Sequence, residues 1–390
     1  MLLIFFFFFF WLTMARGELE MVQVLVRHGD RAPSFTYPLD TSFDVSAHFP
    51  RGFSQLTPRG FEQARELGTF LRARYTSLAS HFDRKRTLIR SSDKDRCIET
   101  AMGITQTLFP ADIVPVHTYS HYKHDLLLKP NSVACRRVER IVASDKRRLV
   151  EVLNAEHRAL FEMLSLRTGW SVDASNIADV FNVLHRKHAN RVPLPEWAHH
   201  VMANVTELKR RLRTLEFDSD EKARLRTGYL LGQMADGMRT QDKKLVVYAS
   251  HDATLTSMMY SLGISDHQLV PYTAALMMEL HQLEGRKYVK ILYRNSTNLP
   301  PHEMRLPGCS VLCPIATFDR IVSRRTISSK HEHDVVCQNR DILKPIPVVA
   351  SSDLHSTPPS SLPDEDASFT LLTVGSLSIF DLFSHLKMKN

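Results

Sequence analysis

A buried strand that ends in an arginine–histidine pair is the feature that most constrains this chain. An apolar run leads directly into Arg27 and His28, and Arg31 follows three residues later. Gly29 allows a sharp turn of the backbone, and Pro33 prevents the strand from resuming. Guanidinium groups suit phosphate oxygens, and their charge favours a neutral, nucleophilic imidazole. The motif predicts a phosphate pocket, although solvated loops can show the same pattern.

Two later strand-like segments also end in residues that suit an anion. Arg90 closes the run at 87–90, and His251 and Asp252 follow the run at 244–249. Ligands of open α/β sheets bind beyond the carboxyl ends of the strands, so we expect these ends to converge on one site. Taken singly, Arg90 could form a surface ion pair and Asp252 could cap a helix.

The order of the patterns predicts the fold class. Strand-like runs at 20–27, 87–90 and 244–249 are separated by segments with helical spacing. This order predicts an α/β fold with a mostly parallel sheet flanked by helices. The runs at 274–282 and 287–294 predict a hairpin.

Between the early and late strands, helical spacing dominates and strand-like runs disappear. We therefore expect a helical insertion at 116–237, inside a sheet domain formed by 18–115 and 238–338.

The two ends of the chain differ from the rest. Residues 1–12 form an apolar block that is too short to span a bilayer, and small residues follow it. We interpret 1–17 as a signal peptide, which implies a secreted or lysosomal protein. Residues 339–390 are rich in proline and serine, so we expect a disordered tail without a membrane anchor.

Secretory entry changes how the five cysteines are interpreted, because disulfides form in that compartment. Cys309 and Cys313 are near enough in sequence to bridge, Cys135 and Cys337 could form a second bridge, and Cys97 would remain as a buried, unreactive thiol. Two sequons suit the same compartment, at Asn204 and Asn295.

The chain carries a formal net charge of +8, with 50 lysines and arginines among its 390 residues. These residues are scattered over helical segments, which is typical of solvated helix faces, and no nucleic-acid motif accompanies them. We expect no nucleic-acid partner. His331 and His333 lie in a polar stretch and are interpreted as solvated, so no metal site is expected there.

The strand-end motifs resemble the two signatures of the histidine acid phosphatases, a branch of the histidine phosphatase superfamily. Arg27-His28-Gly29-Asp30-Arg31-Ala32-Pro33 is similar to one signature and His251-Asp252 to the other. The resemblance covers about 18–337 and includes further segments, at 89–96, 194–198, 293–295 and 306–309. It implies a phosphoglycerate mutase-like fold and hydrolysis of phosphate monoesters, with phosphoproteins or phospholipids as further substrates.

The resemblance also implies a role for each motif residue. His28 would attack phosphorus to form a phosphohistidine, and Asp252 would protonate the leaving alcohol. The phosphoryl oxygens would be held by Arg27, Arg31, Arg90 and His251. No cofactor or metal is expected, because the arginines supply the positive charge. Trp197 matches a pocket tryptophan of the family, with packing at a helix start as the alternative, and the bridges Cys135–Cys337 and Cys309–Cys313 match pairs in relatives.

Alternative functions stay open at this point. A phytase-like or inositol polyphosphate phosphatase would line its pocket with more basic residues, and 116–237 shows no concentrated basic cluster near the motifs. A catalytically silent phosphate-binding relative would be expected to lack His28 or Asp252, and both are present. Relatives are often dimers, so a homodimer is a further expectation. The segment 126–130 lacks the pocket aromatic of vertebrate relatives, so a preference for aryl phosphates is not expected.

Overall fold

A mixed seven-stranded sheet forms the centre of the protein. The computed structural model describes residues 17–41, 43–119 and 124–338. The strand order is β2-β3-β1-β4-β5-β6, and β7 pairs with β5. The strands are β1 (Glu18–Arg27), β2 (Thr87–Ser91), β3 (Leu245–Ser250), β4 (Ala275–Leu283), β5 (Arg286–Arg294), β6 (His302–Met304) and β7 (Cys313–Pro314).

The predicted α/β fold is confirmed, and its parallel part lies where the motifs are. β3 runs parallel to both β1 and β2, whereas β4 and the strands beyond it pair in antiparallel fashion. The predicted hairpin is confirmed as β4–β5. Its turn places Glu284 and Gly285 at φ values of 51° and 74°, the left-handed conformation that a tight hairpin turn needs.

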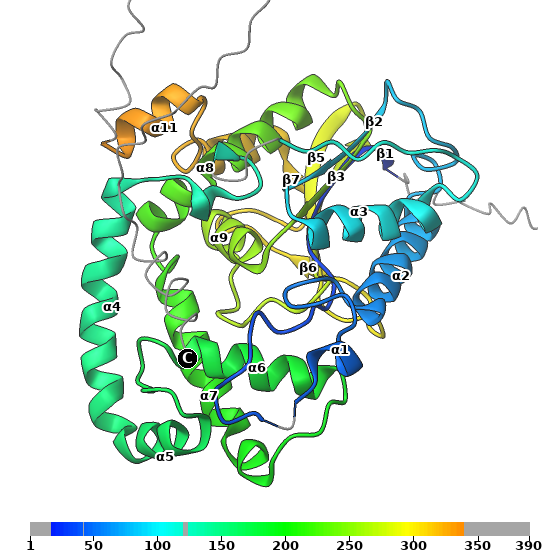
Figure 1. The fold of residues 1–390 in the computed structure, drawn as a ribbon. Coiled ribbons are helices and arrows are strands. Elements are labelled where there is room, and N and C mark those ends of the chain that lie inside the picture. Colours follow the sequence, from blue (N-terminus) through cyan, green and yellow to red (C-terminus); the bar gives the residue numbers. More distant parts are fainter. Residues whose placement is uncertain (1–16, 42, 120–123, 339–390) are drawn as a thin grey trace, which may run out of the picture. The chain divides into compact units, whose positions relative to one another are not determined.

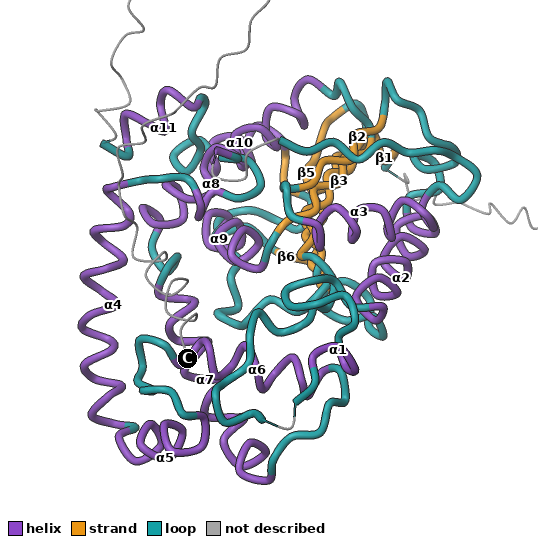
Figure 2. The backbone as a smooth tube through the Cα atoms, viewed as in Figure 1, coloured by secondary structure: helices purple, strands orange, loops and turns teal. Residues whose placement is uncertain are grey.

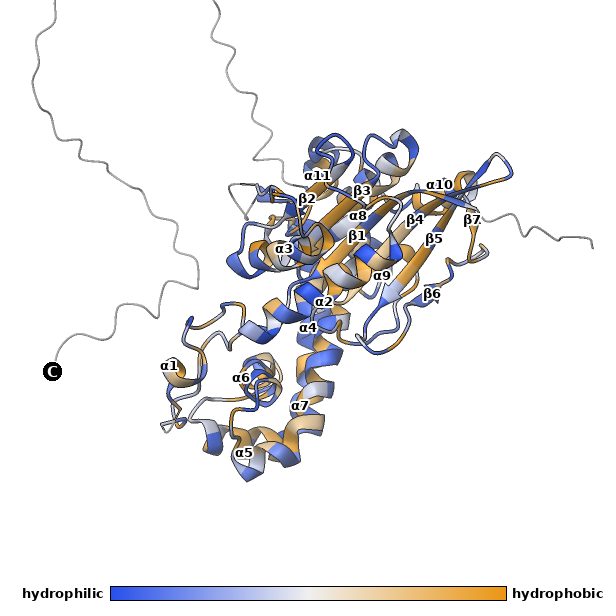
Figure 3. Ribbon diagram, turned by 90° about the vertical axis from the view of Figure 1, so that its right-hand side faces the viewer, coloured by the Kyte–Doolittle hydropathy of each residue, from blue (hydrophilic) through white to orange (hydrophobic). Residues whose placement is uncertain are grey.

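Helices cover both faces of this sheet (Figure 1). On β1, Val22, Val24 and Val26 face one core, and Met21 and Leu25 face the other, as the two-residue period of a strand requires. One face packs against α2 (Pro58–Arg74) and α3 (Asp95–Leu108). The other packs against α8 (Asp220–Thr240), α9 (Asp252–Leu262) and α10 (Ile315–Val322). The hydropathy colouring shows the apolar strands between these layers (Figure 3).

The middle of the chain is helical, as predicted. Its elements are η2 (Pro130–Ser132), α4 (Arg136–Glu156), α5 (Arg158–Thr168), α6 (Ile177–Ala189), α7 (Glu196–Leu215) and most of α8, and the described part of 116–237 contains no strand (Figure 2). Unlike the others, α8 packs on the sheet. Helices α4 to α7 have a core of their own, which includes Phe161, Leu184 and Leu208, and Tyr37 packs into it. The division into separate domains stays a prediction. Two short helices complete the fold, α1 (Val45–His48) and α11 (Lys330–Val336).

The structure contains the two expected disulfides. Cys135, before α4, joins Cys337, after α11, and Cys309 joins Cys313. Cys97 is a buried free thiol, and burial raises its pKa to about 11. The interpretation of His333 as solvated is wrong: it is buried on α11, with Nε2 3.3 Å from the sulfur of Cys337.

The predicted leader and tail fall outside the described residues, apart from Gly17. Within the described part of the chain, no helix combines the length and apolar character needed to cross a membrane.

Candidate active site

The register of two parallel strands brings the two motifs together. Arg27, the last residue of β1, pairs with Ser250, the last residue of β3. His28 and His251 therefore leave the sheet side by side, and their ring centroids lie 5.6 Å apart. The backbone N–H of His28 donates to the carbonyl of Ser250 over 3.0 Å, which fixes this exit.

The loop after His28 is held by the first turns of α2 and the middle of α3. A Cβ on Gly29 would lie 2.2 Å from the carbonyl oxygen of Gly60, so the two backbones can approach this closely only at glycine. The N–H of Gly29 donates to Thr100, and Thr57, which caps α2, donates to the carboxylate of Asp30. These contacts fix the loop that carries the histidine.

The imidazole of His28 is held in one tautomer. Its Nδ1 lies 2.8 Å from the carbonyl oxygen of Gly29, and because a carbonyl only accepts, we assign the proton to Nδ1. Burial, followed by the charges of Arg96 and Arg27, holds the pKa of His28 well below its ordinary value. The ring is therefore neutral, and its Nε2 keeps a free lone pair.

Arg27 and Arg31 lie on either side of this histidine in the chain and remain close to it. The guanidinium of Arg27 stacks 4.0 Å above the ring of Tyr272. Arg31 donates to the carbonyl of Ala32 and, over 3.0 Å, to Ser34. Burial, together with the neighbouring cation Arg186, lowers the pKa of Arg31 to about 9.

The structure does not bring Arg90 to this site. Its guanidinium donates to the carboxylate of Asp125 over 3.1 Å and to backbone carbonyls beside β2. β2 continues through Ser91, so Arg90 lies within the strand, and its side chain is committed to Asp125. Arg96, in the first turn of α3, is instead the cation that acts most strongly on both His28 and His251.

His251 is the N-cap of α9 and is held from the side of β2. Its Nε2 lies 2.9 Å from the hydroxyl of Ser92, and its ring lies 3.7–3.8 Å from the sulfur of Cys97. Burial, followed by Arg96 and Lys129, holds the pKa of His251 well below its ordinary value. This ring is also neutral in the free protein.

Asp252 begins α9 and faces the helical part of the chain. Its Oδ2 lies 3.6 Å from Nη2 of Arg213, and its side chain is 29% exposed. Burial alone would raise the pKa of Asp252, but Arg213, Arg27 and Lys209 together hold it well below its ordinary value. Asp252 is thus an accessible carboxylate, ionised in the free protein, beside His28.

Three cations from the helical insertion act on this carboxylate: Arg213 pairs with it, and Lys209 and Arg186 interact with it electrostatically. Arg186 comes from α6, and Lys209 and Arg213 come from successive turns of α7. The expectation that the insertion places no basic cluster near the motifs is therefore wrong. Sequence reasoning missed these residues because helical spacing shows that Lys209 and Arg213 share a face, and does not show what that face meets.

Trp197 packs against other side chains, which is the alternative to a role in the substrate pocket. It is partly buried in the helical core, where its ring makes an edge contact with Tyr37 over 6.2 Å. None of the ring contacts found among the described residues brings it to His28.

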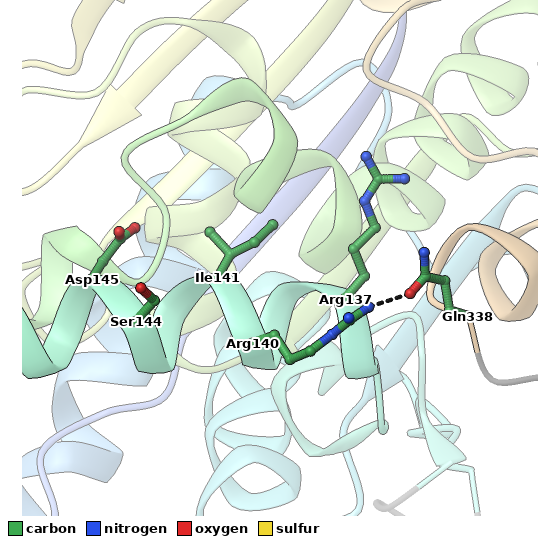
Figure 4. A pocket seen from close by; sticks show the side chains of 6 residues that line it. All are labelled: Arg137, Arg140, Ile141, Ser144, Asp145 and Gln338. Carbon is green, nitrogen blue, oxygen red and sulfur yellow. Dashed lines mark hydrogen bonds between the residues drawn. The ribbon is translucent and has the colours of Figure 1, made fainter.

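An open hollow of about 650 Å³ lies along α4, away from the predicted residues (Figure 4). Its polar side chains are already engaged, because Arg140 bonds Gln338 and Asp145 pairs with Lys222 over 2.6 Å. The strand-end constellation remains the candidate site.

Known proteins resemble this chain in both sequence and fold. The family model of the histidine phosphatase superfamily (branch 2) matches residues 18–191 and 205–294. Lysosomal acid phosphatase of Bos taurus is 33% identical over 335 residues, which are 79% of this chain and 78% of that protein. Prostatic acid phosphatase of Homo sapiens is 32% identical over 332 residues, covering 78% of this chain and 85% of that protein.

Among solved structures, the phytase from Citrobacter braakii aligns with a TM-score of 0.65 at 17% identity and covers 82% of this chain and 99% of its own. The chain is a member of the histidine phosphatase superfamily, branch 2.

Proposed function

We propose that this protein is an acid phosphatase that hydrolyses phosphate monoesters through a phosphohistidine at His28. One observation carries the proposal: a neutral imidazole with an unprotonated Nε2 lies among guanidinium groups and beside the carboxylate of Asp252. The relatives named as lysosomal and prostatic acid phosphatases support the same reaction.

The reaction divides into two displacements. In the first, Nε2 of His28 forms a bond to phosphorus while the ester P–O bond breaks, and Asp252 gives its proton to the leaving oxygen. In the second, Asp252 takes a proton from water as the water oxygen bonds phosphorus. The N–P bond then breaks, which releases inorganic phosphate and restores the lone pair of His28.

Positive groups stabilise the charge on the three phosphoryl oxygens during both steps. Arg27 and Arg31 act from the motif loop and Arg96 acts from α3, in place of Arg90. Two of these guanidiniums, Arg27 and Arg96, have a buried Nε–H without a hydrogen-bond partner among the described residues. A phosphoryl group offers acceptors of the kind that these donors lack.

Asp252 must be protonated to act as the acid, but its pKa in the free protein is low. The pH dependence of the reaction therefore depends on how substrate binding changes this pKa. A bound phosphate ester places negative charge beside the same cations and raises the pKa of Asp252. The monoanion of the ester also brings a proton, which it loses at about pH 6. We therefore expect kcat/KM to fall as pH rises above about 6.

We also propose that the protein works in the secretory lumen, lysosome or extracellular space. Its two disulfides suit an oxidising compartment, and Asn204 of the first sequon is exposed on α7. Glycosylation of Asn204 and Asn295 and formation of a homodimer remain predictions.

The first test traps the covalent intermediate. The protein is mixed with labelled phosphate ester and quenched in alkali, which preserves an N–P bond. His28→Ala should remove the label and lower kcat by roughly 10⁴-fold or more. His200→Ala changes an exposed histidine on α7 and should retain both the label and the wild-type kcat. Label retained in His28→Ala would contradict the nucleophile, and a wild-type protein without turnover between pH 4 and 7 would contradict the function.

The second test addresses the acid. Asp252→Asn should lower kcat for alkyl phosphates by roughly 10²- to 10⁴-fold, because their leaving alkoxides need a proton. p-Nitrophenolate leaves without one, so its ester should lose much less in single-turnover measurements of the first step. Equal losses for the two esters would remove Asp252 from this role.

A further inference from the structure

A buried histidine and two cysteines meet where α11 joins the start of α4. His333 and Cys337 stand four residues apart, so α11 places them one turn apart on the same face, and Nε2 of His333 lies 3.3 Å from the sulfur of Cys337. Cys135, before α4, completes the group through its bridge to Cys337. The ligand atoms of the three residues lie within 4.8 Å of one another, and each residue is at most 1% exposed. The proposed mechanism uses none of them.

The ring of His333 presents a lone pair to this sulfur. The backbone carbonyl of Leu225 on α8 accepts a hydrogen bond from the ring, and burial lowers the pKa of His333. The ring is therefore neutral, with one N–H and one lone pair. Because Nε2 faces Cys337, we assign the N–H to Nδ1 and the lone pair to Nε2. A disulfide sulfur has no hydrogen, so Cys337 in its bridged form cannot satisfy this buried lone pair.

The spacing of these groups fits a thiophilic metal ion. Zn²⁺ lies about 2.3 Å from a thiolate and about 2.0–2.1 Å from an imidazole nitrogen, so a tetrahedral ion holds the two ligand atoms about 3.5 Å apart. The observed 3.3 Å between Nε2 of His333 and the sulfur of Cys337 is close to this value. A histidine that binds a metal also donates its other N–H to a carbonyl or carboxylate, and His333 has such a bond with Leu225.

The surroundings of the two sulfurs bear on whether they ionise. Cys135 and Cys337 belong to an apolar cluster with Val138, and apolar surroundings alone keep a thiol protonated. Arg226 lies near enough to lower the pKa of His333, and its Nη1 is buried without a hydrogen-bond partner among the described residues. A cation beside the group favours the thiolates that a metal ion requires.

We propose that Cys135, Cys337 and His333 form a Zn²⁺ site in the thiol form of the protein, with a fourth position left for water. A dithiol reductant opens the bridge by exchange, so that the S–S bond becomes two thiols and the dithiol becomes a disulfide. Each thiol then loses its proton to solvent as its sulfur bonds Zn²⁺, and Nε2 contributes its lone pair. The ion replaces the bridge as the link between residues 202 positions apart in the chain. This inference is independent of the phosphatase reaction.

The first test measures metal binding by the reduced full-length protein. Wild-type protein is reduced with a phosphine, freed of the reductant without air, and titrated with Zn²⁺ against a chromophoric chelator. We expect the reduced form to bind Zn²⁺ that the oxidised form does not bind, with a Kd below roughly 1 μM. Co²⁺ in the same site should give the absorption spectrum of a tetrahedral ion with thiolate ligands. Equal binding by the reduced and oxidised proteins would overturn the proposal.

Three variants locate the ion. His333→Gln should raise the Kd roughly 100-fold or more, because loss even of a group that only orients a ligand costs roughly 10- to 100-fold. His331→Gln changes an exposed histidine on the same helix and should leave the Kd unchanged. Equal Kd values for wild type and His333→Gln would mean that the ring only packs in the core. Cys337→Ser keeps the thiols of Cys309 and Cys313, so wild-type binding in this variant would assign the ion to that pair. Either result would overturn the site.

A fourth variant separates loss of a ligand from misfolding. His333→Cys places a thiol on the same turn of α11, and it should restore tight binding if His333 is a ligand. Urea unfolding of the reduced proteins gives a second readout, because an ion that binds only the folded state raises the midpoint. Zn²⁺ should raise the midpoint of wild type and of His333→Cys, but not that of His333→Gln. A wild-type midpoint that ignores Zn²⁺, or a folded His333→Cys protein that binds no better than His333→Gln, would overturn the proposal.

Discussion

The strand ends and the helical insertion supply positive charge to the same site in different ways. Arg27 and His28 are fixed by the register of β1 on β3, with a packed core on each face of the sheet. Lys209 and Arg213 are positioned by helices that pack around a separate core. Arg27 and His28 can move only if the sheet moves, whereas the positions of Lys209 and Arg213 depend on how the helices of the insertion pack.

This difference separates the residues that carry out the reaction from the residues that determine its dependence on pH and substrate. Groups at the strand ends touch the reacting phosphoryl group in the proposed mechanism, so their loss should affect every substrate. Groups on α6 and α7 act on the proton donor and on the leaving group, so their loss should depend on pH and substrate. The two regions are joined by hydrogen bonds, because Arg31 donates to Asn182 and Asn190 donates to Asp30 over 2.8 Å.

Beyond the loss of His28 itself, the largest effect should separate Arg96 from Arg90. Arg96→Ala removes a guanidinium beside His28 and should lower kcat/KM for p-nitrophenyl phosphate by roughly 10²- to 10³-fold. Arg90→Ala should leave activity per folded molecule within about threefold and destabilise the protein by about 3 kcal/mol, because it leaves the buried carboxylate of Asp125 unpaired. Steady-state kinetics and urea unfolding measure the two effects.

Arg90→Ala combined with Asp125→Asn is the matched control, since it removes the unpaired charge and should recover part of the stability. If Arg90→Ala instead loses activity as Arg96→Ala does, the assignment from the structure is wrong. The strand ends would then include β2 as well as β1 and β3.

Arg90 and Arg96 show which parts of the site can be predicted from the sequence and which cannot. The convergence of Arg27, His28 and His251 was predictable, because two apolar runs that end in such residues can be recognised without a structure. Arg90 and Arg96 stand six residues apart, and choosing between them requires knowing that β2 extends to Ser91 and that α3 turns its first residues toward His28.

The sequence shows that Arg96 lies one helical turn before Thr100, on the same face of a helix. Only the structure shows that this face of α3 meets the motif loop, where the N–H of Gly29 donates to Thr100. For Lys209 and Arg213, spacing of four residues indicates a shared face, yet only the packing of the insertion determines that this face meets Asp252. The sequence therefore predicts the reaction more readily than the selectivity.

An intermediate effect should appear in the pH profile of an Arg213 variant. Arg213 lowers the pKa of Asp252, so Arg213→Met should raise that pKa. The protonated acid then persists to higher pH, and the alkaline limb of kcat should move upward by about one pH unit. Profiles of kcat for an alkyl phosphate between pH 4 and 8 measure this shift. Arg211→Met should not move the limb, and an unmoved limb in Arg213→Met would leave the helical insertion without influence on the acid.

The smallest effect concerns stability, and it tests a buried histidine that lies near cations of both regions. His185 on α6 stacks on Phe181, and burial, followed by Arg186 and Arg27, lowers its pKa to about 4. The unfolded chain binds a proton near pH 6.5, so stability is lost as pH falls from about 6.5 toward 4. His185→Phe keeps the stacked shape without a titrating group and should reduce the loss between pH 7 and pH 5 by about 1–2 kcal/mol. Urea midpoints at the two pH values measure it, and exposed His200→Gln should leave the loss unchanged. An identical loss in wild type and His185→Phe would mean that the pKa of His185 is not lowered in the folded protein, and that neither its burial nor the charges of Arg186 and Arg27 disfavour its protonation.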